Sequence, residues 1–389
     1  MPVLIDIRPN TYQDSATLMR IASEALAAPD VHNAALLMGT PQNVELLREG
    51  GLDAPELTDA RPADLVVAID AATDDAAAAA IAAAVAALDR AAAPAAAAAA
   101  AGPPVLRAVS EAADANLALI SVPGPYAGGE ALKALKAGLD VHLFSDNVPL
   151  AQEIALKTFA IERNLLMMGA DCGTSIVNGV PIGFANAVRR GRVGVVAASG
   201  TGAQQVTTLV HRLGSGISQA FGAGGRDLSA AVGGLMTRFE LQTLLADERT
   251  AVVVLISKPP APDVAAAVLD DAAAAAKPVV VCFLGADPAP IEGRGAIAAA
   301  TLEDAAVAAV RADRGAVADP ALLAPIDIAM PALAPGQRYV RGLFSGGTFC
   351  YESMLILRDV VGPIHSNIPL DKRDALPDVA RSVGDTCID

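Results

Sequence analysis

Short apolar runs that alternate with helix-length segments constrain the fold of this 389-residue chain more than any other feature. In its second half, Val- and Ile-rich runs are predicted as strands and the segments between them as helices: strands near 193–198, 217–221, 252–256 and 279–284, and helices near 203–213, 231–246 and 263–275. Strands and helices in this rhythm indicate parallel sheets built from right-handed crossovers. The sequence therefore predicts an α/β fold of tandem, open parallel-sheet domains.

The same alternation occurs earlier in the chain, in two regions. Residues 1–90 are predicted as an N-terminal α/β region, with strands near 3–7, 35–38 and 65–69 and helices near 15–27, 42–49 and 75–90. Residues 91–104 are rich in alanine and proline and are typical of a linker. Residues 105–190 are predicted as a Rossmann-like domain, with strands near 117–122, 141–144 and 165–168 and helices near 129–137 and 151–163.

The remaining boundaries follow from the same patterns. Residues 191–315 are predicted as one α/β domain, and residues 316–336, which contain several prolines, as a second linker. In residues 337–389 a strand near 339–344 meets a Ser-Gly-Gly-Thr loop and a helix that ends near Leu357. This segment is too short for an α/β domain of usual size. We therefore expect a partial third unit, which implies a partner chain or a missing C-terminal part.

Composition limits the classes of function. Hydrophobic residues make up 53% of the chain and aromatic residues 3%, so the cores must be packed from Val, Leu, Ile and Ala. The net charge of -15 argues against nucleic acid as a partner, because that partner requires clustered Lys and Arg. No run outside the alanine tract is apolar enough to span a membrane, and residues 1–8 are typical of a strand, not of a signal peptide. We expect a cytoplasmic protein with no membrane partner.

A Ser-Gly-Thr-Gly loop follows the apolar run at 193–198. It consists of Ser199, Gly200, Thr201 and Gly202, and a predicted helix starts there. The first N–H groups of a helix have no intrahelical partner and, with the helix dipole, favour an anion. Glycine allows close backbone approach, and the hydroxyl groups add donors. These residues are candidate phosphate or substrate ligands, although a purely structural strand-to-helix turn is the alternative.

A second glycine loop follows the strand near 217–221. Gly224 and Gly225 are candidate ligands of the same anion, and Arg226 is suited to hold a carboxylate or phosphate through its planar guanidinium. Asp227 is a candidate substrate ligand or the cap of the helix that follows. Because successive parallel strands end at the same sheet edge, we expect both loops to line one crevice.

Asp171, Cys172 and Gly173 follow the strand near 165–168 and are further candidates for substrate binding. A nucleophilic cysteine needs a nearby base and a lowered pKa, and no histidine lies nearby in sequence, so we expect a packed, inert thiol beside a site made by backbone N–H groups. The four cysteines of the chain lie far apart and show no metal-type spacing. No metal site is predicted.

Three further loops lie past strand ends. Pro123 belongs to one, and Ser145, Asp146 and Asn147 belong to another; these are the candidates if CoA or a nucleotide binds. Lys258 ends the strand near 252–256 and is a candidate catalytic cation together with Arg226, with a solvated lysine as the alternative.

The order of these loops resembles the α subunit of succinyl-CoA synthetase and related ADP-forming acyl-CoA synthetases. The resemblance covers roughly residues 105–300 and is carried by the segments 120–123, 169–173, 193–201 and 222–227. It implies a CoA-binding-like Rossmann domain followed by a flavodoxin-like ligase domain.

The chain also resembles the FdrA family over nearly its whole length. The segments that carry this resemblance are 12–15, 38–41, 144–149, 198–204, 225–229, 257–260 and 342–348. Proteins of this type resemble components of an oxamate carbamoyltransferase of purine (allantoin) degradation. The resemblance implies a transferase subunit of a hetero-oligomer that acts on a small anionic substrate. Phosphate and an acyl or carbamoyl phosphate would then be its substrates.

Two catalytic residues of the synthetase have no counterpart in this chain. The segment at 292–296, Glu-Gly-Arg-Gly-Ala, lacks the histidine that carries phosphate, and no carboxylate stands near residues 257–258 to steady it. No CoA loop is recognisable in residues 1–60, so CoA binding stays an open question. We therefore expect carbamoyl transfer to phosphate without a phosphohistidine, with Ser199–Gly202 binding phosphate. The alternatives are an acyl-CoA ligase subunit and a non-catalytic assembly subunit.

Overall fold

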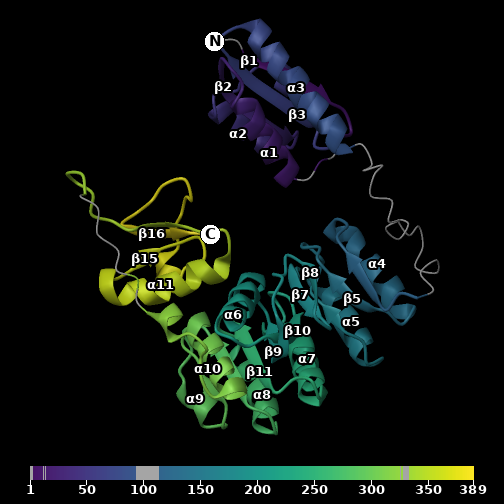
Figure 1. The fold of residues 1–389 in the computed structure, drawn as a ribbon, viewed down its shortest axis with the longest axis vertical. Coiled ribbons are helices and arrows are strands. Elements are labelled where there is room, and N and C mark those ends of the chain that lie inside the picture. The colour runs from purple at the N-terminus through teal and green to yellow at the C-terminus, as the bar shows by residue number, and fades with distance from the viewer. Residues whose placement is uncertain (1–2, 12, 14, 93–113, 325, 327–332) are drawn as a thin grey trace. The chain divides into compact units, whose positions relative to one another are not determined.

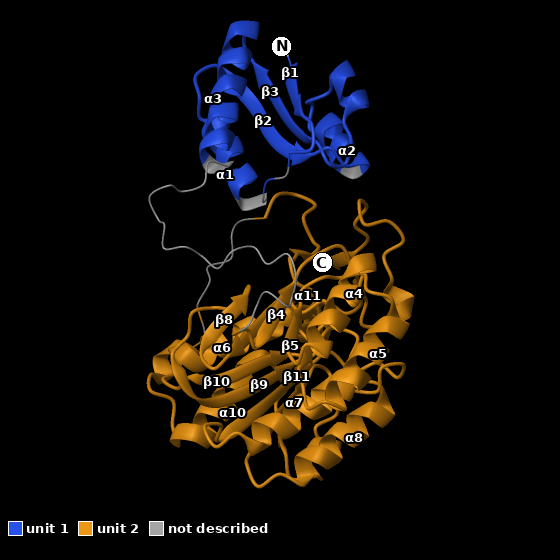
Figure 2. Cartoon of the chain, turned by 90° about the vertical axis from the view of Figure 1, so that its right-hand side faces the viewer, with its two compact units in different colours: residues 1–105 blue, residues 106–389 orange. Residues whose placement is uncertain are grey.

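The computed structural model describes residues 3–11, 13, 15–92, 114–324, 326 and 333–389. The chain divides into two compact units, residues 1–105 and 106–389, coloured blue and orange in Figure 2. Of the linker predicted at 91–104, only residues 91 and 92 are described, and they end a helix. Of the linker predicted at 316–336, the described part contains the short 3-10 helix η3 (Pro320–Leu323).

Unit 1 is an antiparallel sheet with helices on both faces. Its elements are, in order, β1 (Val3–Arg8), α1 (Ser15–Leu26), β2 (Val31–Met38), α2 (Pro41–Glu49), η1 (Pro55–Asp59), β3 (Leu65–Ala71) and α3 (Asp74–Ala92). The crossover from β1 through α1 to β2 leaves room for one strand, and β3 fills it antiparallel to both neighbours. The parallel arrangement predicted from the strand–helix rhythm therefore does not extend to unit 1.

The core of unit 1 follows the alternation of side chains along β3. Leu65, Val67 and Ile69 pack into the layer of α1 and α3, whereas Val66 and Ala68 pack into the layer of α2. Successive strand residues point to opposite faces, so this buried strand needs apolar residues at every position.

Unit 2 begins with a small parallel sheet. It contains β4 (Leu117–Ile120), α4 (Gly124–Lys136), β5 (Asp140–Leu143), α5 (Leu150–Ile161) and β6 (Met167–Met168), in the strand order β4-β5-β6. The predicted Rossmann-like segment is thus parallel α/β structure. Helix α4 starts at Gly124, five residues before the predicted start. Gly124 fits there because an added Cβ would lie 2.4 Å from the carbonyl oxygen of Asp146.

The larger sheet of unit 2 has seven strands in the order β13-β12-β11-β9-β10-β7-β8. Its elements are β7 (Thr174–Val177), β8 (Val180–Gly183), β9 (Arg190–Ala197), α6 (Gly200–Arg212), β10 (Ile217–Gly222), α7 (Leu235–Ala246), β11 (Val252–Ser257), α8 (Pro262–Ala273), β12 (Val279–Phe283), α9 (Ala289–Glu292), β13 (Ile297–Ala298) and α10 (Leu302–Arg314). The five strands from β9 to β13 are parallel, with β10 and β11 on opposite sides of β9. This is the strand order of flavodoxin-like folds.

Helices cover both faces of this sheet (Figure 1). One core is formed between the sheet and α6 with α10, and the other between the sheet and α7 with α8. The central strands supply fully buried residues such as Val195 and Val254, which are partners in register. Among the described helices, none combines the length and the apolar character needed to cross a bilayer.

The hairpin of β7 and β8 was not among the predicted elements. It turns at Asn178 and Gly179, both with positive φ (51° and 81°), and adds two antiparallel strands beside β10. Asn-Gly is the preferred pair for a tight hairpin turn, so the signal was present in the sequence.

The C-terminal part of unit 2 is a second, three-stranded parallel sheet. It contains β14 (Arg341–Leu343), α11 (Gly347–Val361), β15 (Ile364–His365), the 3-10 helix η4 (Lys372–Asp374) and β16 (Asp385–Ile388), in the order β14-β16-β15. Cys350 and Met354 of α11 are fully buried in its small core. The predicted strand and helix are present.

Candidate active site

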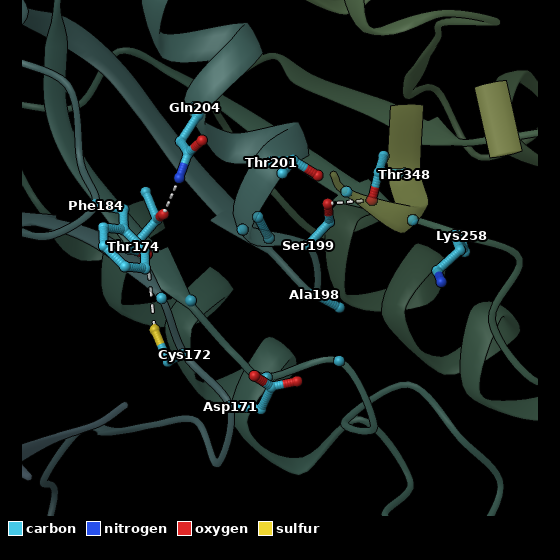
Figure 3. Close-up of a pocket in the computed structure, with 18 of the residues that line it drawn as sticks. Asp171, Cys172, Thr174, Phe184, Ala198, Ser199, Thr201, Gln204, Lys258 and Thr348 are labelled. Carbon is cyan, nitrogen blue, oxygen red and sulfur yellow. Dashed lines mark hydrogen bonds between the residues drawn. The ribbon is translucent and has the colours of Figure 1, made fainter. Parts of the chain in front are cut away.

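A pocket of about 420 Å³ opens at the carboxyl ends of β9 and β11 (Figure 3). These strands are neighbours, but the chain leaves β9 toward β10 on one side and returns through α7 to β11 on the other. The strand order therefore reverses direction between β9 and β11. Open α/β sheets bind ligands at such a reversal, which is called a topological switch point. Residues from several loops of unit 2 line the pocket: Phe144, Asp171, Cys172, Gly173, Thr174, Phe184, Ala197, Ala198, Ser199, Gly200, Thr201, Gln204, Gly222, Gly224, Gly225, Lys258, Gly346, Gly347, Thr348 and Asp389.

Ser199 is the N-cap residue of α6. Its backbone is extended, with φ −156°, and its Oγ accepts a hydrogen bond of 2.9 Å from the N–H of Gly202. A Cβ at position 202 would lie 2.8 Å from Ser199 Oγ and 3.0 Å from Ile256 Cγ2 of β11. The glycine therefore lets the start of α6 pack directly against β11.

The N-terminus of α11 meets that of α6 at the pocket. Ser199 Oγ lies 2.5 Å from Thr348 Oγ1 (Figure 3). Gly346 packs so closely on α6 that an added Cβ would lie 2.6 Å from Thr201 Cγ2. Two helix N-termini, from segments about 150 residues apart in sequence, therefore converge on one cavity.

Four backbone N–H groups at these helix starts have no acceptor among the described residues: those of Gly200, Thr201, Gly347 and Thr348. Unpaired N–H groups and the positive ends of helix dipoles favour a bound anion. Lys258 follows β11 and lines the same pocket; its Nζ lies 3.3 Å from the place that a Cβ of Gly347 would occupy. Asp389 also lines this side, and its Oδ1 accepts a hydrogen bond of 2.8 Å from the N–H of Gly346. The four N–H groups and Lys258 nevertheless make this side of the pocket suited to phosphate or a carboxylate.

The loop after β10 packs on the loop after β6. An added Cβ at Gly222 would lie 2.4 Å from Cys172 Sγ, and one at Gly224, where φ is +89°, would lie 2.4 Å from the carbonyl oxygen of Ala170. At Gly225 an added Cβ would meet nothing within 4 Å. The first two glycines thus let two backbones approach each other, and the third borders open space in the pocket.

Arg226 and Asp227 do not line the pocket, so their predicted roles in catalysis and substrate binding are corrected. Arg226 Nη2 lies 2.6 Å from Glu153 Oε2 and donates to the carbonyl oxygen of Val148 at 2.8 Å. Asp227 is fully buried, accepts a hydrogen bond from Lys157, and accepts two more from N–H groups at the start of α7. Both side chains are paired with partners within the protein.

Lys157 joins the two sheets beneath this loop. Its fully buried Nζ donates to Glu153 Oε1 at 2.8 Å, to Asp227 Oδ1 at 2.7 Å and to the carbonyl oxygen of Ala223 at 2.9 Å. On α7, Glu240 is also fully buried; desolvation and the neighbouring Asp227 raise its pKa well above the usual value. Lys157 and Arg226 together therefore supply the cations for Glu153 and Asp227, and burial favours the protonated form of Glu240.

Cys172 lines the pocket as a neutral thiol. Its Sγ lies 3.4 Å from Ser175 Oγ and 3.8 Å from His142 Nδ1, and burial raises the pKa of the thiol to about 12. Desolvation lowers the pKa of His142 to about 4, so the imidazole is neutral at pH 7 as well. A histidine does lie near Cys172 in space, which its distance in sequence conceals. The pair has no thiolate to act as a nucleophile, in agreement with an inert cysteine.

The four candidates for cofactor binding lie outside this pocket. Pro123 caps α4, and Asn147 has φ +54° and packs its backbone on Gly124. Ser145 is buried and its Oγ donates to the carbonyl oxygen of Val122 at 2.5 Å, while Asp146 does not line the cavity. Their contacts are those of residues that shape loops, so the structure gives no support to a cofactor at these positions.

Several lining residues were not among the predicted ones. Gln204 Nε2 donates to Thr174 Oγ1 at 2.9 Å, and the rings of Phe144 and Phe184 pack edge to face with centroids 5.3 Å apart. Gln204 lies one helical turn after Gly200, a spacing that places both on the same side of α6. The spacing of Gly200 and Gln204 could be seen in the sequence. That Thr174 and Phe184, in and just after the β7–β8 hairpin, line the pocket could not be seen there.

Comparison with protein families gives two matches. Residues 1–103 match the model "AllF, heavy metal-associated domain", and residues 188–285 match the model "CoA binding domain". The second match falls on the seven-stranded sheet that carries the pocket. Together with the parallel sheets, it defines a protein of the CoA-ligase superfamily.

The particular family follows from a longer match. The chain is 41% identical to the protein YahF of Escherichia coli (strain K12), which is described as uncharacterized; the match covers 100% of this chain and 76% of YahF. This chain therefore belongs to the FdrA-like family, as its sequence motifs predicted.

More distant relatives are ligases and synthetases. One is the α subunit of an ADP-forming succinate–CoA ligase of Aquifex aeolicus, which is 31% identical over 131 residues. The match covers 31% of this chain and less than half (43%) of that subunit. A solved structure of a dinucleotide-forming acetyl-coenzyme A synthetase 1 of Ca. Korarchaeum cryptofilum is 18% identical, with a TM-score of 0.44, over 65% of this chain and 56% of that one.

The residues present do not fit a heavy-metal site in unit 1. All four cysteines lie at position 172 or later, so residues 1–103 contain no thiol ligand for a soft metal ion. Within the described ranges, no group of three or more His, Cys, Asp and Glu side chains is placed to hold a metal. No metal-dependent step is assigned to this chain.

Proposed function

We propose that this chain is a subunit of an enzyme that transfers a carbamoyl group between oxamate and phosphate in purine (allantoin) catabolism. Membership of the FdrA-like family and the match of residues 1–103 to a domain named after AllF support this choice. The observation that carries the chemistry is the convergence of the α6 and α11 N-termini with Lys258 on one pocket.

The reaction needs a phosphate site beside a site for a carboxylate. A phosphate oxygen attacks the carbamoyl carbon of carbamoyl-oxamate, the C–N bond breaks, and the nitrogen leaves with a proton as oxamate, so carbamoyl phosphate forms. The first-turn N–H groups of α6 and α11 hold the phosphate, and Lys258 stabilises the charge that develops during transfer. The N–H groups of the Gly224–Gly225 loop, on another wall of the pocket, hold the oxamate carboxylate.

Direct transfer needs no covalent phosphohistidine. None of the four histidines of the chain lines the pocket: His142 lies behind Cys172, and His32, His211 and His365 are also absent from its lining. The segment aligned with the synthetase's histidine loop ends α9 with Glu292 and continues with Gly293 and Arg294. This supports attack by phosphate itself.

The remaining features of the proposal concern the assembly. We expect the chain to work in the cytoplasm as one subunit of a hetero-oligomer, as its family resemblance implies. Its substrates are small anions.

The test is turnover by the chain together with the subunits that copurify with it. Formation of carbamoyl phosphate from carbamoyl-oxamate and phosphate is expected, with kcat/KM lowered by at least about tenfold in Lys258→Ala, the loss typical of one charged transition-state contact. Lys136→Ala, an exposed lysine at the end of α4, is the control and should match the wild type. Absence of turnover in the intact complex would contradict the proposal.

A second candidate is an ADP-forming acyl-CoA ligase. The match of residues 188–285 to a CoA-binding model and the identity to the succinate–CoA ligase α subunit favour it. It predicts thioester formation that requires CoA, nucleotide and a carboxylic acid. Detection of that product in place of carbamoyl phosphate would select this function.

A further inference from the structure

Two acidic residues, Asp171 and Asp389, line a pocket whose helix starts and lysine are suited to anions. Asp171 follows β6, has φ +59°, and its N–H donates to the carbonyl oxygen of Ser145 at 3.0 Å. Figure 3 shows its side chain beside the cavity, below Cys172 and Ala198 and away from Thr201. An ionised carboxylate at this position would repel the substrate, so its presence calls for a chemical role.

Charged groups from several elements surround Asp171. Asp146 lies in the loop after β5, Glu153 on α5, and Arg226 in the loop after β10; Lys258 after β11 lines the same pocket. Desolvation, then Asp146 and Glu153, raise the pKa of Asp171, and Arg226 opposes them. Arg226 is also paired with Glu153 at 2.6 Å, and its lowering effect on the pKa of Asp171 is smaller than the effects of desolvation and Asp146. The protonated form of the carboxyl is therefore favoured beyond what is usual for aspartate.

We infer that Asp171 is the catalytic acid and base of this pocket, which gives a proton to the departing nitrogen of oxamate and takes it back in the reverse reaction. The inference rests on the proposed function. In the forward direction phosphate forms the new C–O bond, the C–N bond breaks, and the electron pair left on nitrogen takes the Asp171 proton. The carboxylate that remains is reprotonated from solvent.

Other lining groups are less suited to this transfer. Asp389 Oδ1 accepts a hydrogen bond of 2.8 Å from the N–H of Gly346, so this carboxylate lies at the start of α11, where phosphate is proposed to bind. Cys172 has a pKa of about 12 and is buried, so it holds its proton too tightly. Lys258 lies where a cation is needed to neutralise phosphate, and His142 is fully buried behind Cys172. Asp171 is the carboxyl on the wall formed by the loops after β6 and β10, where the oxamate carboxylate is proposed to bind.

Sulfate binding tests the charge of Asp171 without turnover. Sulfate stays a dianion above about pH 4, so any pH dependence of its affinity from there upward comes from the protein. In the wild type, affinity should fall about fivefold as Asp171 ionises, the size expected for one like charge in a wet pocket. In Asp171→Asn the affinity should stay flat with pH. Asp263→Asn, in the exposed first turn of α8, should behave as the wild type.

Turnover of the complex tests the proton transfer. Asp171→Asn should lower kcat by about 10²–10⁴-fold, the usual contribution of a general acid, while Asp171→Glu should recover part of the rate with a shifted pH profile. If sulfate and phosphate do not bind to any variant, the proposed function fails and the inference fails with it. If they bind, but Asp171→Asn keeps the wild-type pH dependence and rate, only the role of Asp171 is overturned.

Discussion

Ser199 Oγ and Thr348 Oγ1 lie 2.5 Å apart, although the two residues stand at the starts of different helices, α6 and α11, and are separated by 149 positions in the chain. This contact brings the first turns of α6 and α11 together. Each helix start offers N–H groups without acceptors, and Lys258 lies beside them. One hydroxyl pair thus fixes the distance between two positively polarised helix ends, which is the geometry on which the proposed phosphate site depends.

Removing the hydroxyl groups of α6 should weaken that site. In the double variant Ser199→Ala with Thr201→Val, we expect phosphate affinity to fall about tenfold and the free energy of unfolding to fall by about 1 kcal/mol through loss of the cap. Calorimetric titration and urea unfolding measure the two effects. An assembly-only role predicts instead that the double variant keeps full activity in the complex.

Gly224 and Gly225 form a matched pair of positions for testing loop packing. Gly224→Ala places a Cβ 2.4 Å from the carbonyl oxygen of Ala170 at φ +89°, so we expect a loss of about 2–4 kcal/mol in the free energy of unfolding. Gly225→Ala meets nothing within 4 Å and should change stability by less than about 1 kcal/mol. Thermal unfolding compares the two variants. Equal effects would show that the loop does not pack as described.

Lys157 should be essential for stability. Lys157→Met leaves Asp227 buried without its cation, while Glu153 keeps its pair with Arg226, and we expect a cost of about 3–5 kcal/mol. Lys133→Met on α4, which breaks an exposed pair with Glu130, should cost less than about 1 kcal/mol. Urea unfolding at pH 7 measures both. A small effect of Lys157→Met would mean that water reaches the buried carboxylates.

His142 should make stability depend on pH in a defined window. Desolvation lowers its folded pKa to about 4 from 6.5, so between these values the unfolded chain binds a proton that the folded chain does not. The free energy of unfolding should therefore fall as pH falls through this window, by on the order of 3 kcal/mol from this group. His142→Gln should remove that part of the slope. If the free energy of unfolding changed with pH in the same way in the wild type and in His142→Gln, the result would contradict this role of His142.

Local patterns were sufficient to predict much of the fold. The Val-rich runs and the glycine loops behind them predicted β9 to β12 and the sheet edge at which the pocket opens. The antiparallel sheet of unit 1 was not predictable in this way, because the strand–helix rhythm does not encode that β3 inserts between β1 and β2. The hairpin at Asn178 and Gly179 had a readable turn signal that went unused.

The candidate site was predictable only where backbone groups make it. Ser199, Gly200 and Gly225 line the pocket because parallel strands end on a common edge. Arg226 and Asp227 turn away because Glu153 and Lys157, on a helix about 70 residues earlier, offer buried partners. A side chain's direction depends on such distant partners, which spacing along the sequence does not show.

A crystal structure of the chain grown with phosphate tests the central claim most directly. The account predicts phosphate bound between the first turns of α6 and α11, within hydrogen-bond distance of N–H groups of Gly200 or Thr201 and of Gly347 or Thr348, with Lys258 Nζ against it. Phosphate bound elsewhere in unit 2, with this pocket empty at saturating concentration, would contradict the account.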